Sequence, residues 1–301
     1  MASESFFLQF GPGLVENDHS VRVICEIEVD DGKQPALARW HGPQAGWTFF
    51  PMQWMPVRLA QLELPQPCVF ALGGDGTVGL GYGGYSEESI NTTDTGPRGR
   101  GPLRVLRAIA GRLYAAGMGR QVYRRADAGV WEVLDPPKVP VPGEIDICGF
   151  TSIDGVDEDE IWAVGYRGEI WRASGLQWSE MASPTNLTLH VVRTFKKHLV
   201  FAAGKMGLVL GFVDDAWRVL AQIPGGEDIW DLEWFGGQLF AATSTRLFKL
   251  LPDATFEEVA VPGLTSFGYL HANDGVLWSF GTLQLAWTTD AIVWTAQTPT
   301  L

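Results

Sequence analysis

The chain of 301 residues is poor in cysteine and in long apolar segments. Its three cysteines, Cys25, Cys68 and Cys148, are an odd number, and each lies in or beside an apolar run. This usage argues against a disulfide framework and predicts buried free thiols in a reducing compartment. No stretch approaches the ~20 apolar residues that cross a bilayer, and residues 1–5 lack the basic and apolar parts of a secretory signal. We therefore expect a cytoplasmic protein.

Positive charge is also scarce. The 22 Lys and Arg residues are outnumbered by 35 Asp and Glu, so the formal net charge is −13 at pH 7. Nucleic-acid binding depends on Lys and Arg that neutralise phosphates, so this balance argues against nucleic acid and against anionic membranes. The charge is compatible with a basic protein partner, because opposite fields steer association. It is equally compatible with the ordinary solubility of an acidic protein.

The residue spacings of common catalytic and metal sites are missing too. The sequence contains no GxxxxGK[ST], CxxC, HExxH or GxSxG, and none of its five histidines lies at metal-ligand spacing from another. The glycine-rich run 79–84 follows an expected strand but opens no helix, so it is interpreted as a turn and not as a phosphate loop. The sequence therefore predicts no catalytic residue, no metal site and no cofactor.

What the chain has instead is an aromatic residue that returns at a nearly constant interval, each time just after a tight polar turn. These marker aromatics are separated by 84, 47, 39, 39 and 38 residues, and the first gap is two intervals of 42 with one marker missing. The second repeat carries the polar, glycine-rich stretch 82–101 in place of a marker. A period near 40 residues indicates a repeat architecture. The markers are Trp47, Trp131, Trp178, Trp217, Phe256 and Trp294.

Each repeat has the pattern of four short strands. About 18 residues before a marker, an apolar run, a small-residue turn and a second alternating run predict a β-hairpin, as in 161–172. The marker opens a further strand, as in 131–134, and another extended stretch precedes the hairpin. Seven such units predict an all-β fold, a seven-bladed β-propeller of four-stranded antiparallel blades with the markers packed between them. We expect one domain over 1–301, with blades at about 5–55, 56–100, 101–140, 141–183, 184–223, 224–261 and 262–301.

Two of the marker turns resemble the Asp-box turns of BNR, sialidase-like propellers, Ser-x-Asp-x-Gly-x-Thr-Trp. They span 288–294 and 127–131; in both the aromatic comes one residue early, and Asp290 lacks the following glycine. The segment 163–170 is similar to the AxGxxGxI segments of YCF48-like propellers. The resemblance implies a seven-bladed propeller whose Asp-box turns are structural and lie on the rim.

The sialidase resemblance also implies what an enzyme would need, namely three channel arginines that converge on a carboxylate, with a tyrosine and acidic residues. Arg107 and Arg193 hold equivalent places on expected innermost strands, and Glu63 and Glu233 share their register. These four could line the channel floor. The alternative, which we favour, is that they form surface ion pairs beside solvent-facing turns. The Arg-Ile-Pro motif of that family is missing from the N-terminal region.

Partner binding is expected on the loops of the propeller. The segment 225–231 combines one tryptophan with three carboxylates at the entry to an innermost strand, and 54–55 occupies the corresponding loop of the first blade. The stretch 82–101 should project beside them. An aromatic ringed by acidic groups suits a basic protein surface. The predicted partner-binding residues are Trp230, Glu227, Asp228, Asp231, Trp54 and Tyr85.

A second acidic cluster, Asp154 with 157–160, lies within one predicted blade and should point from the opposite face as a solvated loop. Its spacing does not match an EF-hand.

Together these features predict a non-catalytic, protein-binding propeller that is monomeric when free. We expect a bacterial immunity or antitoxin-type protein whose acidic loop face neutralises a basic toxin or nuclease. One alternative is a glycosidase- or lactonase-type enzyme that uses Arg107, Arg193, Glu63 and Glu233 in the channel. A third is an assembly factor resembling the YCF48 group, whose binding surface would be basic and arginine-rich.

Overall fold

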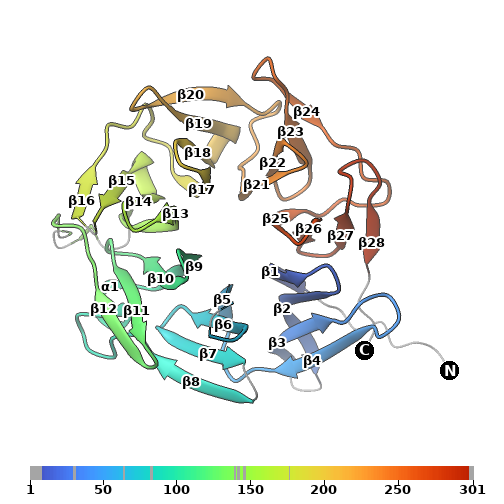
Figure 1. Cartoon of the computed structure of the whole chain (residues 1–301), viewed down its shortest axis with the longest axis horizontal. Helices are drawn as coiled ribbons and strands as arrows, with labels where there is room; N and C mark the ends of the chain where they lie inside the picture. The colour runs from blue at the N-terminus through green and yellow to red at the C-terminus, as the bar shows by residue number, and fades with distance from the viewer. Residues whose placement is uncertain are drawn as a thin grey trace.

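The computed structural model describes residues 9–29, 32–63, 65–81, 84–138, 140, 143–144, 147–175 and 177–297. Seven four-stranded antiparallel sheets stand around a central channel, as Figure 1 shows, so the predicted all-β, seven-bladed propeller is confirmed. Within each sheet the strands follow in chain order from the channel to the rim. No helix in the described ranges is long and apolar enough to cross a membrane.

The first four blades come from residues 9–180. Blade 1 is β1 (Gln9–Asn17), β2 (Ser20–Val29), β3 (Gly32–Trp40) and β4 (Trp47–Pro51); blade 2 is β5 (Pro56–Leu62), β6 (Cys68–Gly73), β7 (Thr77–Gly81) and β8 (Tyr85–Ser89). Blade 3 is β9 (Leu103–Ile109), β10 (Arg112–Gly117), β11 (Val122–Asp127) and β12 (Val130–Val133); blade 4 is β13 (Phe150–Asp157), β14 (Glu160–Gly165), β15 (Ile170–Ser174) and β16 (Gln177–Glu180).

The last three blades come from residues 189–297. Blade 5 is β17 (Leu189–Lys196), β18 (Leu199–Gly204), β19 (Leu208–Val213) and β20 (Ala216–Gln222). Blade 6 is β21 (Asp231–Phe235), β22 (Gln238–Ala242), β23 (Leu247–Leu250) and β24 (Phe256–Glu258); blade 7 is β25 (Gly268–Asn273), β26 (Val276–Gly281), β27 (Leu285–Thr288) and β28 (Thr295–Gln297). The helical turns are α1 (Pro97–Arg100), η2 (Tyr166–Gly168) and η3 (Lys205–Gly207).

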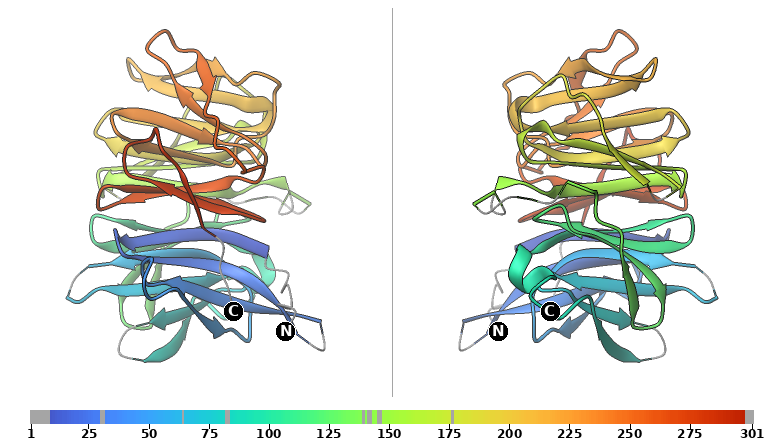
Figure 2. Two further views of the ribbon diagram at one scale, coloured as in Figure 1. Left: turned by 90° about the vertical axis from the view of Figure 1, so that its right-hand side faces the viewer. Right: turned by 90° about the vertical axis from the view of Figure 1, so that its left-hand side faces the viewer.

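The antiparallel order sorts the connections onto two opposite faces of the disc (Figure 2). One face carries the connections between blades and the turns between second and third strands, and we call it the loop face. The other carries the turns between first and second strands and between third and fourth strands, and we call it the hairpin face. The innermost strands β1, β5, β9, β13, β17, β21 and β25 line the channel that joins the two faces (Figure 1).

The marker aromatics pack between blades, as predicted. Each lies in or just before an outermost strand and contacts the preceding blade. The indole Nε1 of Trp131 donates to Glu88 of blade 2 at 2.9 Å, and Trp178 Nε1 donates to the Leu134 carbonyl at 2.7 Å. Trp217 packs edge-on against Trp162 of blade 4, with ring centroids 5.3 Å apart. The markers therefore join neighbouring sheets by apolar contact and by directional hydrogen bonds.

Blade 2 does have an aromatic at the marker position, contrary to prediction. Tyr85 begins β8 and pairs with Gly81, just as Trp47 begins β4 and pairs with Trp40. Its ring packs on Phe50 of blade 1, with centroids 5.2 Å apart, and is 43% exposed. The sequence concealed this marker because a tyrosine inside a polar, glycine-rich stretch does not stand out as a core residue. Tyr82, where that stretch was predicted to begin, lies outside the described residues.

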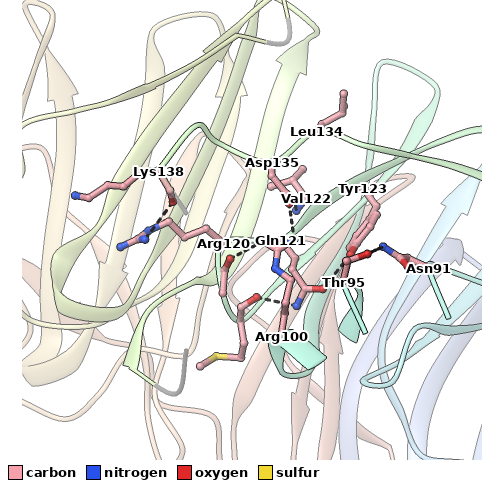
Figure 3. Close-up of polar contacts among 12 residues, drawn as sticks. Asn91, Thr95, Arg100, Arg120, Gln121, Val122, Tyr123, Leu134, Asp135 and Lys138 are labelled. Atoms are coloured by element: carbon pink, nitrogen blue, oxygen red, sulfur yellow. Dashed lines mark hydrogen bonds and ion pairs between the residues drawn. The ribbon is translucent and has the colours of Figure 1, made fainter. Parts of the chain in front are cut away.

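The connection between blades 2 and 3 was predicted to project but instead packs against blade 3 (Figure 3). Its last helical residue, Arg100, donates to Asp135 at 2.5 Å and to the Gly119 carbonyl at 2.7 Å. Gln121 donates to the Gly101 carbonyl at 2.9 Å and accepts a bond from the Tyr123 hydroxyl at 2.9 Å. Because these buried polar groups satisfy one another, the connection is fixed to the propeller and is not a free arm.

Blades 1 and 7 meet without exchanging a strand in the described part of the chain. Trp40 packs edge-on against Trp278 with ring centroids 5.2 Å apart, and Gly13 leaves the space that the Phe280 ring occupies, since a Cβ there would overlap it. The Phe10 amide donates to the Thr282 carbonyl at 2.8 Å. Side-chain packing and a few hydrogen bonds therefore close the ring.

Candidate functional site

The channel wall carries charged side chains that link one blade to the next. Arg107 on β9 donates to Asp154 on β13 at 2.8 Å, and Asp154 accepts from the Thr194 amide on β17 at 2.8 Å. Arg193 on β17 donates to Asp231 on β21 at 2.5 Å. Asp231 in turn accepts from the Leu270 amide on β25 at 3.3 Å. These contacts brace four consecutive junctions, from blade 3 to blade 7.

Two titratable groups complete this wall. Burial raises the pKa of Glu233 to about 7, although Arg193 and Arg107 oppose the rise. Burial, together with the same two arginines, lowers the pKa of His271 to about 3. His271 is therefore neutral near pH 7, and its Nδ1 accepts from the Val15 amide at 3.2 Å, which links blade 7 to blade 1. The polar wall thus consists largely of groups that already bind one another.

The expectation that Arg107, Arg193, Glu63 and Glu233 form surface ion pairs was wrong: three of them belong to the channel wall, and Glu63 is exposed but has no Lys or Arg nitrogen within 4.0 Å in the described residues. Arg193 and Glu233 are buried, and Arg107 is held by the buried Asp154. Glu63 lies beyond the end of β5, is exposed and accepts from Gln61 at 2.5 Å; it lines the same hollow as Arg107 and His271 but is not bound to an arginine. Both channel arginines are already bound to carboxylates, whereas a sialidase-like site would need arginines free to meet a substrate carboxylate.

The predicted partner-binding residues are divided between different surfaces. Glu227, Asp228 and Trp230 lie together on the loop face, in the connection between blades 5 and 6. Asp231 does not join them, because it begins β21, is 4% exposed and is bound to Arg193. Its carboxylate belongs to the channel wall, so Asp231 does not share the surface of Glu227 and Asp228. The sequence feature that distinguishes Asp231 from Asp228 is that Asp231 begins a strand.

The carboxylates on this connection have internal partners. Glu227 accepts from Arg246 and Thr245, each at 2.9 Å; burial opposes ionisation, but these bonds hold the pKa of Glu227 below its usual value. Asp228 accepts from the Met206 amide at 3.0 Å. Trp230 stacks on His190 with centroids 4.5 Å apart. The negative charge predicted for this loop is therefore partly compensated by Arg246.

Trp54 and Tyr85 share one acceptor. Trp54 Nε1 donates to Glu87 at 2.9 Å and the Tyr85 hydroxyl donates to the same oxygen at 2.5 Å. Trp54 lies on the loop face, whereas Tyr85 follows a turn of the hairpin face. The two aromatics flank the junction between blades 1 and 2, and blades 5 and 6 lie across the ring from it (Figure 1).

Exposed carboxylates gather on the hairpin face instead. Eight exposed acidic residues in or beside its turns have no Lys or Arg nitrogen within 4.0 Å in the described residues. Turn chemistry explains the choice of aspartate, since Asp290 accepts from the Ile292 and Val293 amides, both at 2.8 Å. The charges nevertheless remain uncompensated. The eight are Asp18, Glu63, Asp127, Asp159, Asp215, Asp253, Asp274 and Asp290.

The second acidic cluster lies on the hairpin face, as predicted, but only part of it is solvated. Asp154 and Glu160 are buried, and Glu160 lies 3.9 Å from Arg172. Glu158, in the turn, accepts from Arg124 at 2.8 Å. In the described residues, no group of three or more His, Cys, Asp or Glu could hold a metal ion.

The thiols are unreactive in this environment. Cys25 and Cys148 are buried and Cys68 is half-buried, and none forms a disulfide. Burial raises the pKa of all three, that of Cys25 to about 12. Thiolate nucleophiles have a lowered pKa, so these cysteines are structural residues.

Comparison with solved structures gives the class of the protein. YCF48 bound to D1 peptide has a TM-score of 0.65 at 11% identity, over 94% of this chain and 92% of that one. The WD40 propeller domain of Doa1 has a TM-score of 0.67 at 10% identity, over 95% of each chain. Both likenesses concern the fold, and they define a β-propeller. No protein-family model matches the chain.

Comparison with curated proteins gives the family. The immune protein Tsi7 of Pseudomonas aeruginosa is 36% identical over 237 residues, which are 76% of this chain and 75% of the relative. The chain therefore belongs to the family of the immune protein Tsi7, in agreement with the predicted immunity-type propeller.

Proposed function

We propose that this protein is an immunity protein that neutralises a toxin by binding it, and that the hairpin face receives a basic surface of that toxin. Membership of the Tsi7 family supports the immunity role. The uncompensated carboxylates of the hairpin turns support the basic character of the partner. The channel wall, whose charged groups bind one another, offers no comparable set of free groups for catalysis.

The charge distribution favours the hairpin face over the loop face that the sequence indicated. Carboxylates such as Asp159 and Asp215 have no cationic partner, whereas Glu227 is bound to Arg246. A basic partner gains most from charges that are not already neutralised. Opposite fields of this kind raise association rates by roughly 10–10³-fold and lose strength as salt screens them.

The test is to measure association with the toxin that co-purifies with this protein. The hairpin variant carries Asp159→Asn, Asp215→Asn, Asp253→Asn and Asp274→Asn. Asparagine tolerates the same turns, so the variant should fold normally. We expect about a tenfold slower association at low salt, with a difference that shrinks as salt is added.

The matched control changes two carboxylates of the loop face, Glu227→Gln and Asp228→Asn. We expect it to associate almost as fast as the unchanged protein. An unchanged rate in the hairpin variant together with a slower rate in the control would assign the toxin to the loop face, where Trp230 and Trp54 lie. If the unchanged protein binds no toxin, the immunity role itself is refuted.

The proposal includes a free monomer that works in the reducing cytoplasm before it meets its toxin. The three free cysteines support a reducing compartment. Light scattering of the purified protein checks the monomer, and fractionation of the producing cell checks the compartment.

A further inference from the structure

The mouth of the channel on the loop face is a funnel of about 850 Å³, lined by six of the blades and by Trp230 from the connection between blades 5 and 6. That volume lies within the range of sites that hold small ligands, roughly 300–1,000 Å³. The wall includes several aromatic and positively charged residues. Among them are Tyr166, Trp230, Tyr269, Arg58, Arg104 and Lys205.

The cations of this funnel, Arg58, Arg104 and Lys205, have no carboxylate oxygen within 4.0 Å among the described residues. Four arginines have no carboxylate oxygen within 4.0 Å in the described residues, whereas the others are all paired. All four lie on the loop face, and two of them line the funnel. Among the described residues that line the funnel, Glu26 is the one carboxylate, and it lies 3.9 Å from Lys33 outside the funnel. The four are Arg58, Arg98, Arg104 and Arg167.

Aromatic rings hold two of these guanidinium groups. The Arg58 guanidinium carbon lies 4.5 Å from the centroid of the Tyr269 ring, and that of Arg104 lies 6.0 Å from Tyr166. A guanidinium placed over a ring keeps its N–H donors directed outward in its own plane. Five such donors form a fork that matches the two oxygens of a carboxylate or phosphate. These arginines are therefore positioned but not neutralised.

A third polar group of the wall also lacks a partner. His190 stacks on Trp230, and its Nε2 is buried without a hydrogen-bond partner in the described residues. An Asp228 oxygen lies 3.6 Å away, too far for a good hydrogen bond. A buried nitrogen left without a partner costs free energy, so this pair is an imperfect contact in the funnel wall.

We propose that this funnel binds a small molecule that carries two or more oxyanion groups, carboxylates or phosphates. Arg58 comes from blade 2, Arg104 from blade 3 and Lys205 from blade 5, so a molecule with several separated charges suits their distribution around the funnel. The site lies on the face opposite the proposed toxin surface, so it is independent of that proposal.

The test uses citrate and tripolyphosphate as probes, with calorimetric titration of the full-length protein at low ionic strength. We expect saturable binding of at least one probe. Tighter binding of citrate would indicate a carboxylate ligand, and tighter binding of tripolyphosphate would indicate a phosphate ligand. Arg104→Gln should weaken that binding about tenfold or more, as the loss of a charge-assisted hydrogen bond implies. Arg58→Gln should act in the same direction. The exposed Arg218→Gln on the hairpin face is the matched control and should bind like the unchanged protein.

Melting temperatures of the ligand-free variants establish that they fold. Arg104 is exposed, so Arg104→Gln should disturb folding least. Absence of binding by both probes would overturn the proposal, and so would unchanged affinity in the Arg58→Gln/Arg104→Gln double variant. Binding of a polyglutamate peptide without binding of either small anion would also overturn it, because the funnel would then be a polypeptide site.

Discussion

Replacing Arg193 by methionine tests the bracing role of the channel. Arg193 is buried and donates to Asp231, to the Leu232 carbonyl at 3.1 Å and to the Val192 carbonyl at 3.3 Å. Methionine fills a similar volume without charge. The substitution leaves the 4%-exposed Asp231 without its counter-ion, and the Leu232 and Val192 carbonyls each lose the donor that Arg193 provides, although Val192 keeps the Ser152 hydroxyl at 3.4 Å.

The expected cost follows from the burial of the pair. Removing one partner of a buried ion pair destabilises a protein by about 3–5 kcal/mol, because the remaining charge is uncompensated. Asp231 keeps its bonds from the Leu232 and Leu270 amides, and Arg107 remains in the same wall. We therefore expect about 3 kcal/mol. Adding Asp231→Asn removes the stranded charge and should recover about 2 kcal/mol.

The measurement is equilibrium urea unfolding, followed by tryptophan fluorescence and by circular dichroism, whose transitions must coincide for the free energies to be used. A loss below about 1 kcal/mol for Arg193→Met would refute the bracing role. A double variant less stable than Arg193→Met would refute the stranded-charge explanation.

Three further predictions concern other parts of the propeller. Trp278→Ala should cost about 3–5 kcal/mol, because Trp278 is fully buried where blades 1 and 7 meet; a loss under about 1 kcal/mol in urea unfolding would contradict its role there. The raised pKa of Glu233, about 7, means that folding favours its protonated form, so its contribution to stability is fully present below its usual pKa of 4.5 and is lost as pH rises through about 7. Glu233→Gln should therefore raise the melting temperature at pH 8 but not at pH 4.5, and equal shifts at both would exclude this titration. Cys25, with a pKa of about 12, should resist iodoacetamide until the protein unfolds, whereas equal labelling before and after unfolding would show that the thiol is accessible.

The sequence predicted the propeller because the marker aromatics recur at the spacing of one blade. Trp47 and Trp217 stand after polar turns, where an indole is conspicuous. Tyr85 occupies the equivalent position in blade 2, but a tyrosine in a stretch of glycines and serines does not stand out as a core residue. Periodicity therefore predicted the number of blades and missed one of the residues that join them.

The channel wall was harder to predict, because its partners belong to different repeats. Equivalent register placed Arg107 and Arg193 correctly on innermost strands. Their carboxylate partners, Asp154 and Asp231, were assigned to loops because acidic neighbours surround each of them in the sequence. Each channel arginine is bound by a carboxylate from the next blade, about 40 residues later in the sequence. The separations are 47 residues for Arg107 and Asp154 and 38 residues for Arg193 and Asp231.

The seam between blades 1 and 7 has a consequence for how the disc comes apart. A peptide segment joins every other pair of neighbouring blades, whereas within residues 9–297 β1 and β25 are held by contacts across the gap. If sheets separate, those at this seam can part without a described segment of backbone that restrains them. We therefore expect unfolding of the disc to begin at this seam, where the packing of Trp40 against Trp278 opposes it.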